Sequence, residues 1–437
     1  MIQKNIDKVL QNYHCLLGSG VCLARPSVIY GGNNISNINL KIQQLSMADY
    51  HKVMYKTNAV AAYHIAGYGQ SYEETLTRAM GETIERFSFM ELHHLFSDEF
   101  LIEGSYDDLK NKYKIIDKCF FSPIEDKTGR FCNFSESSIY KWIELINYSD
   151  NSKILYPMFL VAGNKNMENL ILPTMSTGTA VHITYIEALI NAITEALQID
   201  CFMKFWYGKI PLPQVEWRDY VSVGFEKCIR SVFPNEDDFE IIVLDCSLGI
   251  EGFFNYITII KNKNNKPPFL TMGIQGGCNP EYTLLRSIME AAAIYVNYQE
   301  MYIYKAEYIN ALFLETVKKS CNLDDTFLYW GNYNDLSDKS KLLSDLISSK
   351  KITLKKQTSL SKKDELLHLF NILKKTTNYF SFLEITPPEF LKYGYKCVRA
   401  IIPELLPMCF PAFPYVNSSF FVNKGGIKND GFPHPLP

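Results

Sequence analysis

The sequence has 437 residues, of which 47% are hydrophobic and 21% charged, and its formal net charge is -3. This balance is typical of a globular chain that buries a sizeable core, and without a basic excess there is no electrostatic case for nucleic-acid binding. No run of about 18 apolar residues predicts a membrane span. The polar N-terminus, "MIQKNIDKVLQNYHC", is not typical of a signal peptide. We therefore expect a cytoplasmic protein that binds neither nucleic acid nor membrane.

The cysteines and histidines do not follow metal-binding patterns. The eleven cysteines stand singly with no C-x-x-C pair, so they indicate reduced, mostly buried thiols rather than a zinc site. His93 and His94 are adjacent, so on a helix their rings would point to different sides.

In chain order, the pattern predicts an α/β (α+β) fold with mixed sheets and helices packed on them. Ser71 and Glu74 fit a capping box at the start of a long helix, and apolar residues at helical spacing follow them. The expected elements are a short helix and a Gly/Asn loop within 1–60, a helix over 72–95, a buried strand at 154–163, loop-helix units at 176–207 and 273–296, strands at 240–246 and 254–260, a hairpin to "FLTMGI", a polar surface excursion at 331–365 and a final core strand, "KCVRAIIPELL".

Three internal loop-helix repeats share one register. In each, a glutamate lies six residues after a leucine and three residues after a small residue, behind a glycine-containing loop. The three sets are Leu76, Ala79 and Glu82; Leu189, Ala192 and Glu195; Leu284, Ser287 and Glu290; their loops contain Gly67 and Gly69, Gly178, and Gly276 and Gly277. A solvated glutamate has no reason to recur at one register, so the repeat predicts three carboxylates that converge on one site.

Converging carboxylates are suited to Mg²⁺, which often bridges to substrate phosphates. Backbone N–H groups at helix N-termini bind phosphate, and Arg78, Arg86 and Arg286 are candidates for charge-assisted bonds to it. The alternative is a solvated helix face, because Arg78 with Glu82 and Glu82 with Arg86 are i, i+4 pairs.

These motifs together resemble the YcaO family. "GYGQSYEETLTRAMGETIERFS" is similar to its first signature, "STGTAVHITYIEALINAITEALQIDCFMKFW" to its second, "RSIMEAAA" to its third, and the final "PHPLP" to the P-x-P-x-P ending of its azoline-forming members. The resemblance covers about residues 15 to 437. It implies a YcaO-type ATP-binding fold, with a segment at 1–60 leading into a YcaO domain at 61–437 whose Pro-rich tail spans 431–437.

The resemblance also implies which residues hold Mg²⁺ and ATP. By this resemblance the metal ligands are Glu82, Glu85, Glu195 and Glu290, and the nucleotide-binding residues are these four with Ser71, Arg86, Gln198 and Arg286. One departure is clear: Gln198 and Ile199 stand where the family often has Glu and Arg. Gln198 still offers an oxygen but no charge, and Ile199 cannot pair with phosphate.

The reaction implied by the resemblance is ATP-dependent O-phosphorylation of a peptide backbone amide. A Cys, Ser or Thr side chain attacks the preceding carbonyl, and loss of phosphate leaves a thiazoline or oxazoline. The residues expected to orient the substrate or act as the base are Pro433, Pro435 and Pro437. Prolines stiffen the tail towards polyproline II; the alternative is a disordered terminus.

The expected partners follow from the same resemblance. They are a ribosomal precursor peptide, a separate leader-binding E1-like protein, a flavin dehydrogenase and a second copy of the chain in a homodimer. Two other functions remain open. One is an enzyme that makes thioamides or amidines, and the other is a degenerate scaffold without turnover, which Gln198 and Ile199 motivate.

Overall fold

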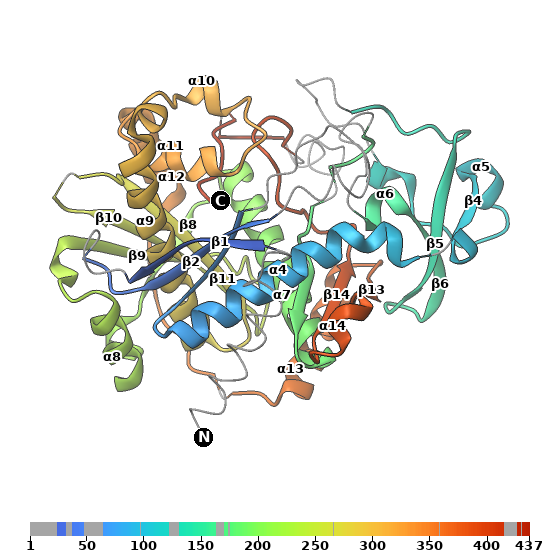
Figure 1. Ribbon diagram of the computed structural model, residues 1–437, viewed down its shortest axis with the longest axis horizontal. Helices are drawn as coiled ribbons and strands as arrows, with labels where there is room; N and C mark the ends of the chain where they lie inside the picture. Colours follow the sequence, from blue (N-terminus) through green and yellow to red (C-terminus); the bar gives the residue numbers. More distant parts are fainter. Residues whose placement is uncertain are drawn as a thin grey trace.

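Helices pack on several β-sheets (Figure 1), which gives the α/β (α+β) fold that the sequence predicts. Among the described residues the five-stranded sheet is mixed and the three-stranded sheets are antiparallel. The computed structural model describes residues 24–31, 37–47, 64–96, 98–121, 131–162, 170–173, 175–264, 266–357, 359–414, 426–429 and 431–437. Within these ranges no helix has both the length and the apolar character that a bilayer crossing requires. The short helix expected near the N-terminus lies outside them.

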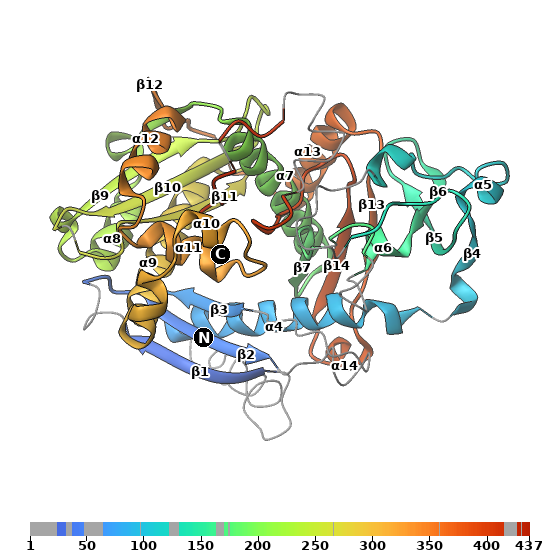
Figure 2. The ribbon, with the colours of Figure 1, turned by 90° about the horizontal axis from the view of Figure 1, so that it is seen from above.

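The first sheet is antiparallel, in the order β1-β2-β3, and carries the long helix α4. The predicted cap starts this helix, since the Ser71 hydroxyl accepts from the N–H of Glu74 (3.2 Å). Ala79, Met80 and Ile84 bury its apolar stripe. Figure 2 shows α4 continuing past this sheet along the molecule. The bounds are β1 Ala24–Gly31, β2 Lys41–Met47, β3 His64–Gly69 and α4 Tyr72–Leu95. The expected boundary at residue 60 therefore falls between two paired strands.

The second sheet, β13-β14-β7, is also antiparallel and carries α7 and α13. Thr184 caps α7 by accepting from the N–H of Glu187 (3.3 Å). Most of α7 is buried, which explains its nearly continuous apolar sequence. The bounds are β7 Thr179–His182, α7 Tyr185–Gly208, α13 Lys362–Thr376, β13 Ser381–Glu384, α14 Pro388–Leu391 and β14 Lys396–Ile401.

The third sheet has five strands, in the order β11-β10-β9-β8-β12, and α9 packs on β10 and β11. Asn279 caps α9, and Pro280 occupies its first turn, where the missing N–H costs nothing. The predicted hairpin into "FLTMGI" is confirmed as the antiparallel pair β10 and β11. The bounds are β8 Leu212–Glu216, α8 Val223–Val232, β9 Phe239–Asp245, β10 Phe254–Asn262, β11 Leu270–Gly277, α9 Pro280–Asn310 and β12 Ile347–Thr353.

The segment 331–365 is not simply a surface excursion, so that expectation is partly wrong. β12 pairs in parallel with β8 at the end of the five-stranded sheet. Lys339 is fully buried, and its ammonium donates to the carbonyl of Tyr329 (2.5 Å). The alternating charges of this segment predicted a solvated surface, although part of the segment belongs to the core. The helices near this segment are α10 Leu314–Val317, α11 Asp324–Gly331 and α12 Leu336–Leu346.

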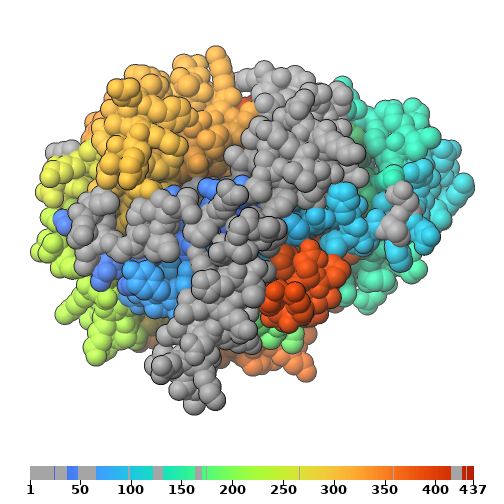
Figure 3. Space-filling view, in the orientation of Figure 1, coloured from blue at the N-terminus to red at the C-terminus, as the bar shows by residue number. Residues whose placement is uncertain are grey.

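A smaller lobe, built on the sheet β4-β5-β6, projects at one end (Figure 3). The strand predicted over 154–163 is correct only in its first half, because the chain turns at Pro157 into a short helix. The bounds are β4 Ile102–Ser105, α5 Tyr106–Leu109, β5 Ile139–Asn147, β6 Ser152–Pro157 and α6 Met158–Val161. Short 3₁₀ turns lie at Asp98–Phe100, Lys118–Phe121, Arg218–Tyr220 and Glu236–Asp238.

Candidate functional site

The three repeats share one structural link as well as one sequence register. In each, the glutamate reaches back from its helix and accepts a hydrogen bond from a backbone N–H in or beside the preceding strand. The pairs are Ala66 N–H with Glu82 (3.1 Å), Gly178 N–H with Glu195 (3.0 Å) and Ile274 N–H with Glu290 (2.8 Å). The common register is therefore confirmed as a common geometry, in which a carboxylate on the helix is hydrogen-bonded to the backbone in or beside the preceding strand.

Glycines beside these glutamates serve close packing more than loop formation. Gly67 and Gly69 lie within β3, and Gly276 and Gly277 within β11, not in loops as predicted. A Cβ at Gly67 would collide with the Thr75 carbonyl on α4. Glycine is thus needed where a strand touches its helix closely, and the sequence could not distinguish this need from a turn.

Burial and the nearby carboxylates disfavour ionisation of Glu85, Glu195 and Glu290. Burial raises the pKa of Glu195 to about 7, and the Arg86 and Arg399 charges oppose that rise. Burial also raises the pKa of Glu290 to about 7. For Glu85, burial raises the pKa well above its usual range, Arg86 lowers it, and the nearby charges of Glu195 and Glu82 raise it. A bound cation relieves both costs.

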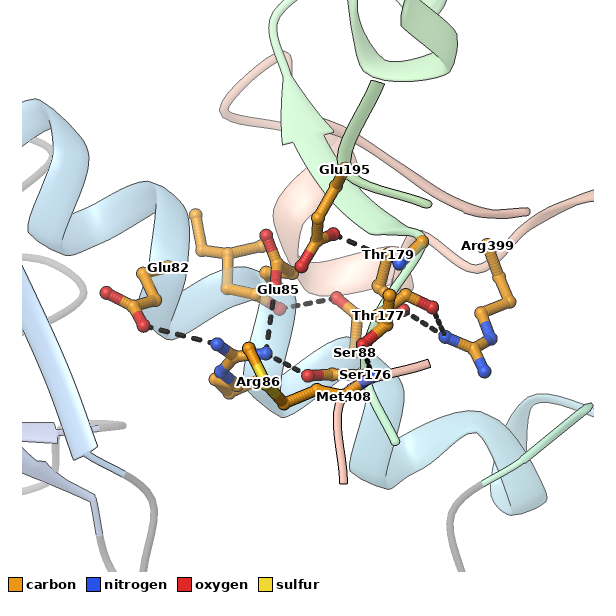
Figure 4. Close-up of polar contacts among 12 residues, drawn as sticks. Glu82, Glu85, Arg86, Ser88, Ser176, Thr177, Thr179, Glu195, Arg399 and Met408 are labelled. Atoms are coloured by element: carbon orange, nitrogen blue, oxygen red, sulfur yellow. Dashed lines mark hydrogen bonds and ion pairs between the residues drawn. The ribbon is translucent and has the colours of Figure 1, made fainter. Parts of the chain in front are cut away.

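Arg86 lies between α4 and the turn that precedes β7 (Figure 4). Its guanidinium pairs with Glu82 (3.3 Å) and Glu85 (3.2 Å) and donates to the Ser176 hydroxyl. The i, i+4 pair of Glu82 with Arg86 is present, but both side chains are half-buried. The alternative of a solvated face is therefore wrong for this part of α4.

A second group of charges surrounds Tyr68 of β3. Arg286 is 5% exposed and stacks over the Tyr68 ring, 4.8 Å from its centroid, and it lies 3.5 Å from a Glu74 oxygen. Arg78 pairs with the same carboxylate (2.9 Å); the expected pair of Arg78 with Glu82 was wrong. Burial raises the pKa of Tyr68 to about 12. Ser71 lies at the same helix end, where its observed role is the cap.

The departure at Gln198 has a structural explanation. The Gln198 side-chain oxygen accepts from the N–H of Gly276 (2.7 Å), two residues along β11 from the N–H held by Glu290. Gln198 thus repeats the link between helix and strand without a charge. Ile199 is 4% exposed and packs in a hydrophobic core cluster. Asp200 is buried and accepts from the N–H of Leu406 (3.0 Å).

The Pro-rich tail is docked, which contradicts the disordered alternative. Two indole N–H groups and a hydroxyl hold its carbonyls, and the side chains of Phe432, His434 and Leu436 are buried. Pro433 and Pro435 are buried too, whereas Pro437 is partly exposed. The hydrogen bonds are Trp206 N–H to Phe432 O (2.9 Å), Trp330 N–H to Pro433 O (2.8 Å), Thr326 hydroxyl to Leu436 O (2.8 Å) and His434 Nε2–H to Cys409 O (2.8 Å).

Sequence reasoning missed Arg399 of β14. It is 6% exposed, and its guanidinium donates to the Thr177 carbonyl (2.6 Å) and the Thr179 hydroxyl (3.0 Å) (Figure 4). The available signal was one charged residue inside the apolar run "KCVRAII", which we read only as a core strand.

The donor set fits Mg²⁺ bound together with phosphate. Among the described residues, no three Asp, Glu, His or Cys side chains are placed to hold one metal ion by themselves. Mg²⁺ commonly takes only one or two carboxylates, and substrate phosphates and water complete its shell. Within the described part of the chain, the second oxygen of Glu195 and of Glu290 makes no hydrogen bond. These oxygens remain available as ligands.

Of two cavities among the described residues, one is lined by residues of the site and the other is not. One, of about 80 Å³, lies behind the turn before β7 and is lined by Thr177, Ala196 and Arg399 among others. The other, of about 630 Å³, lies between the starts of α8 and α9 and residues 354–357. None of the residues predicted from the sequence to form the site lines this second cavity.

Comparisons with known proteins identify the family and the fold. Residues 66–406 match a family profile described as YcaO cyclodehydratase, ATP- and Mg²⁺-binding. No curated protein sequence matches the chain. A solved heterocyclase in complex with substrate and cofactor has a TM-score of 0.70 at 15% identity, over 98% of this chain and 57% of its own.

Two further structures are similar over most of their own length. The YcaO protein from Methanopyrus kandleri, bound with AMPPCP and Mg²⁺, has a TM-score of 0.58 at 14% identity, over 92% of this chain and 90% of its own. A chain of the E. coli microcin synthetase McbBCD complex has a TM-score of 0.61 at 12% identity, over 95% and 96%. At these identities the likeness shows a shared fold, and the YcaO-type fold expected from the resemblance is confirmed.

Proposed function

The chain belongs to the YcaO family, and we propose that it closes Cys, Ser or Thr residues of a ribosomal precursor peptide into thiazolines or oxazolines by ATP-dependent amide activation. ATP and Mg²⁺ are the cofactors of this family. The observation that carries the proposal is the link repeated in α4, α7 and α9, which holds one glutamate of each helix in the same geometry.

We assign the glutamates to Mg²⁺ and the arginines to phosphate. Glu82, Glu85, Glu195 and Glu290 would hold the metal, Arg86 and Arg286 the phosphates, and Ser71 and Gln198 the rest of the nucleotide. The bound Mg²⁺-ATP supplies a phosphoryl group, which makes the amide oxygen a leaving group. The arginines stabilise negative charge in a site with little water.

The atoms balance as one dehydration for each ring. The side-chain sulfur or oxygen of the reacting residue bonds to the preceding carbonyl carbon and gives up its proton. The new C–S or C–O bond closes the ring. The carbonyl oxygen then departs within inorganic phosphate, the amide nitrogen loses its proton, and a C=N bond forms in the ring. The tail residues Pro433, Pro435 and Pro437 would orient the peptide for these proton transfers. The hydrogen bonds that dock the tail support this role.

We propose that a separate leader-binding protein presents the precursor peptide. The chain covers 96% of a chain that belongs to a multiprotein microcin synthetase, which supports a partner subunit. Oxidation of the rings by a flavin dehydrogenase and assembly of the chain as a homodimer complete the proposal. Residues 61–437 would act as the YcaO domain.

Calorimetric titration with a non-hydrolysable ATP analogue tests the site. We expect Mg²⁺-dependent binding that Glu195→Gln abolishes. Glu226→Gln is the matched control. It removes a partly exposed carboxylate on α8 whose partner among the described residues is Arg230 (3.7 Å), and it should leave binding unchanged. Equal binding by the Glu195→Gln variant would disprove the metal role.

Mass spectrometry of a precursor peptide treated with the chain and its partner then decides the reaction. Loss of one water per ring supports azoline formation, whereas exchange of oxygen for sulfur would mean a thioamide. Nucleotide binding without any product in the complete mixture would favour the scaffold role that Gln198 and Ile199 suggest.

A further inference from the structure

The turn before β7 connects three parts of the site. Its Ser176 hydroxyl accepts from Arg86 of α4, its Gly178 N–H donates to Glu195 of α7 (3.0 Å), and its Thr177 hydroxyl accepts from the N–H of Met408 (3.2 Å). Figure 4 shows Arg86, Glu195 and Met408 around this turn. A movement of this turn would therefore displace Arg86 and Glu195 together.

The turn is held both by its own backbone and by β14. The N–H of Thr179 donates to the carbonyl of Ser176 (2.8 Å), and Gly178 has a φ of +84°, which glycine adopts without strain. The N–H of Ala400 on β14 donates to the carbonyl of Gly178 (2.7 Å). A Cβ at Gly178 would lie 3.0 Å from the Ala400 carbonyl, so the turn packs tightly on β14, and side-chain bonds from that strand can fix its position.

Arg399 adds two side-chain bonds from β14. Its guanidinium donates to the Thr177 carbonyl (2.6 Å) and to the Thr179 hydroxyl (3.0 Å), so it is bonded to the residue before Gly178 and to the residue after it. It also lies 5.0 Å over the Phe89 ring of α4. Both bonds come from one nitrogen, Nη1, and the rigid plane of the guanidinium fixes their directions, which a lysine ammonium on a flexible stem does not.

We propose that Arg399 is a positioning residue for Mg²⁺-ATP, acting through the turn Ser176–Thr179 and not by contact with the nucleotide. The inference rests on the proposed function, because the glutamate that the turn orients is one of the proposed metal ligands. Partners behind a metal ligand fix its orientation, and their loss typically lowers metal affinity by roughly tenfold to a hundredfold.

The test compares Arg399→Met and Arg399→Lys with the control Lys396→Met. Lys396 lies on the same strand but is partly exposed and pairs with Glu384 (3.1 Å), so its variant removes a positive charge without touching the turn. We expect Arg399→Met to raise the Kd for the Mg²⁺-ATP analogue by roughly tenfold or more. Arg399→Lys should recover part of the affinity through one bond to Thr177, and the control should match wild type.

Hydrogen exchange provides a readout that needs no nucleotide. The amide of Gly178 should exchange faster in Arg399→Met than in wild type or the control, because the turn is released. Wild-type affinity in folded Arg399→Met would overturn the proposal, and so would unchanged exchange at Gly178. If Arg399→Met does not fold, wild-type affinity in Arg399→Lys overturns it. Failure of the wild type to bind nucleotide refutes the proposed function instead, and the exchange experiment alone then judges whether Arg399 holds the turn.

Discussion

Glu290→Gln is expected to stabilise the fold without ligand at alkaline pH and to abolish Mg²⁺-dependent nucleotide binding. The Glu290 carboxylate accepts from the N–H of Ile274 (2.8 Å), and a glutamine oxygen preserves that bond. The substitution removes only the charge. It therefore separates the cost of a buried carboxylate from the structural link that the same side chain makes.

The magnitude follows from proton linkage. The pKa of Glu290 rises from 4.5 to about 7 on folding, chiefly through burial. A raised carboxyl pKa means that its contribution to stability is fully present below pH 4.5 and is lost as the pH rises through about 7. The complete loss is at most about 3 kcal/mol. The stability gap between the glutamine variant and wild type should widen by about 2 to 3 kcal/mol between about pH 5 and about pH 8.5.

Urea unfolding at several pH values, with and without the Mg²⁺-ATP analogue, measures this gap. Saturating ligand should stabilise wild type and leave the variant unchanged. Glu290→Ala is the companion variant. It also lacks the charge but leaves the Ile274 N–H without its acceptor, so it should be about 1 to 3 kcal/mol less stable than Glu290→Gln at every pH. If wild type and Glu290→Gln show parallel pH profiles, the burial argument is refuted.

Three further outcomes are expected. Removal of Pro437 alone should abolish ring formation. Nucleotide affinity and Tm should stay near wild type, since this partly exposed residue makes no hydrogen bond among the described residues. Normal product yield would exclude the tail from the chemistry. Trp206→Phe leaves the Phe432 carbonyl without its indole donor (2.9 Å) and should lower the free energy of unfolding in urea by about 1 to 3 kcal/mol. An unchanged unfolding midpoint would contradict the role of Trp206 in docking the tail. Gln198→Glu keeps an acceptor for Gly276 (2.7 Å) and adds a charge, so it should lower the Kd for Mg²⁺ in calorimetry; an unchanged Kd would place Gln198 outside the metal shell.

The periodicity of the sequence predicted the long helices and the repeat well. The cap at Ser71, the helix over 72–95 and the shared register of Glu82, Glu195 and Glu290 all appear in the structure. These features are local or depend on a repeated spacing, which is the information that a single sequence carries. The assignment of these residues to Mg²⁺ and ATP stays a prediction.

Features that depend on contacts distant in the chain were not predictable. Glycines in β3 and β11 were interpreted as loops because close approach to a helix leaves the same signature as a turn. Arg399 lies more than 200 residues after the turn that it holds, and nothing in a strand pattern names its partner. The charged run around Lys339 looked solvated because its burial depends on carbonyls of another helix.

The position of β11 at the edge of its sheet gives two of the proposed site residues a structural role as well. The N–H groups of Ile274 and Gly276 are buried, and Glu290 and Gln198 accept hydrogen bonds from them. Buried N–H groups without an acceptor destabilise a fold. Variants that shorten both side chains should therefore loosen β11 and the site together, so a loss of activity in them would combine lost chemistry with lost folded protein.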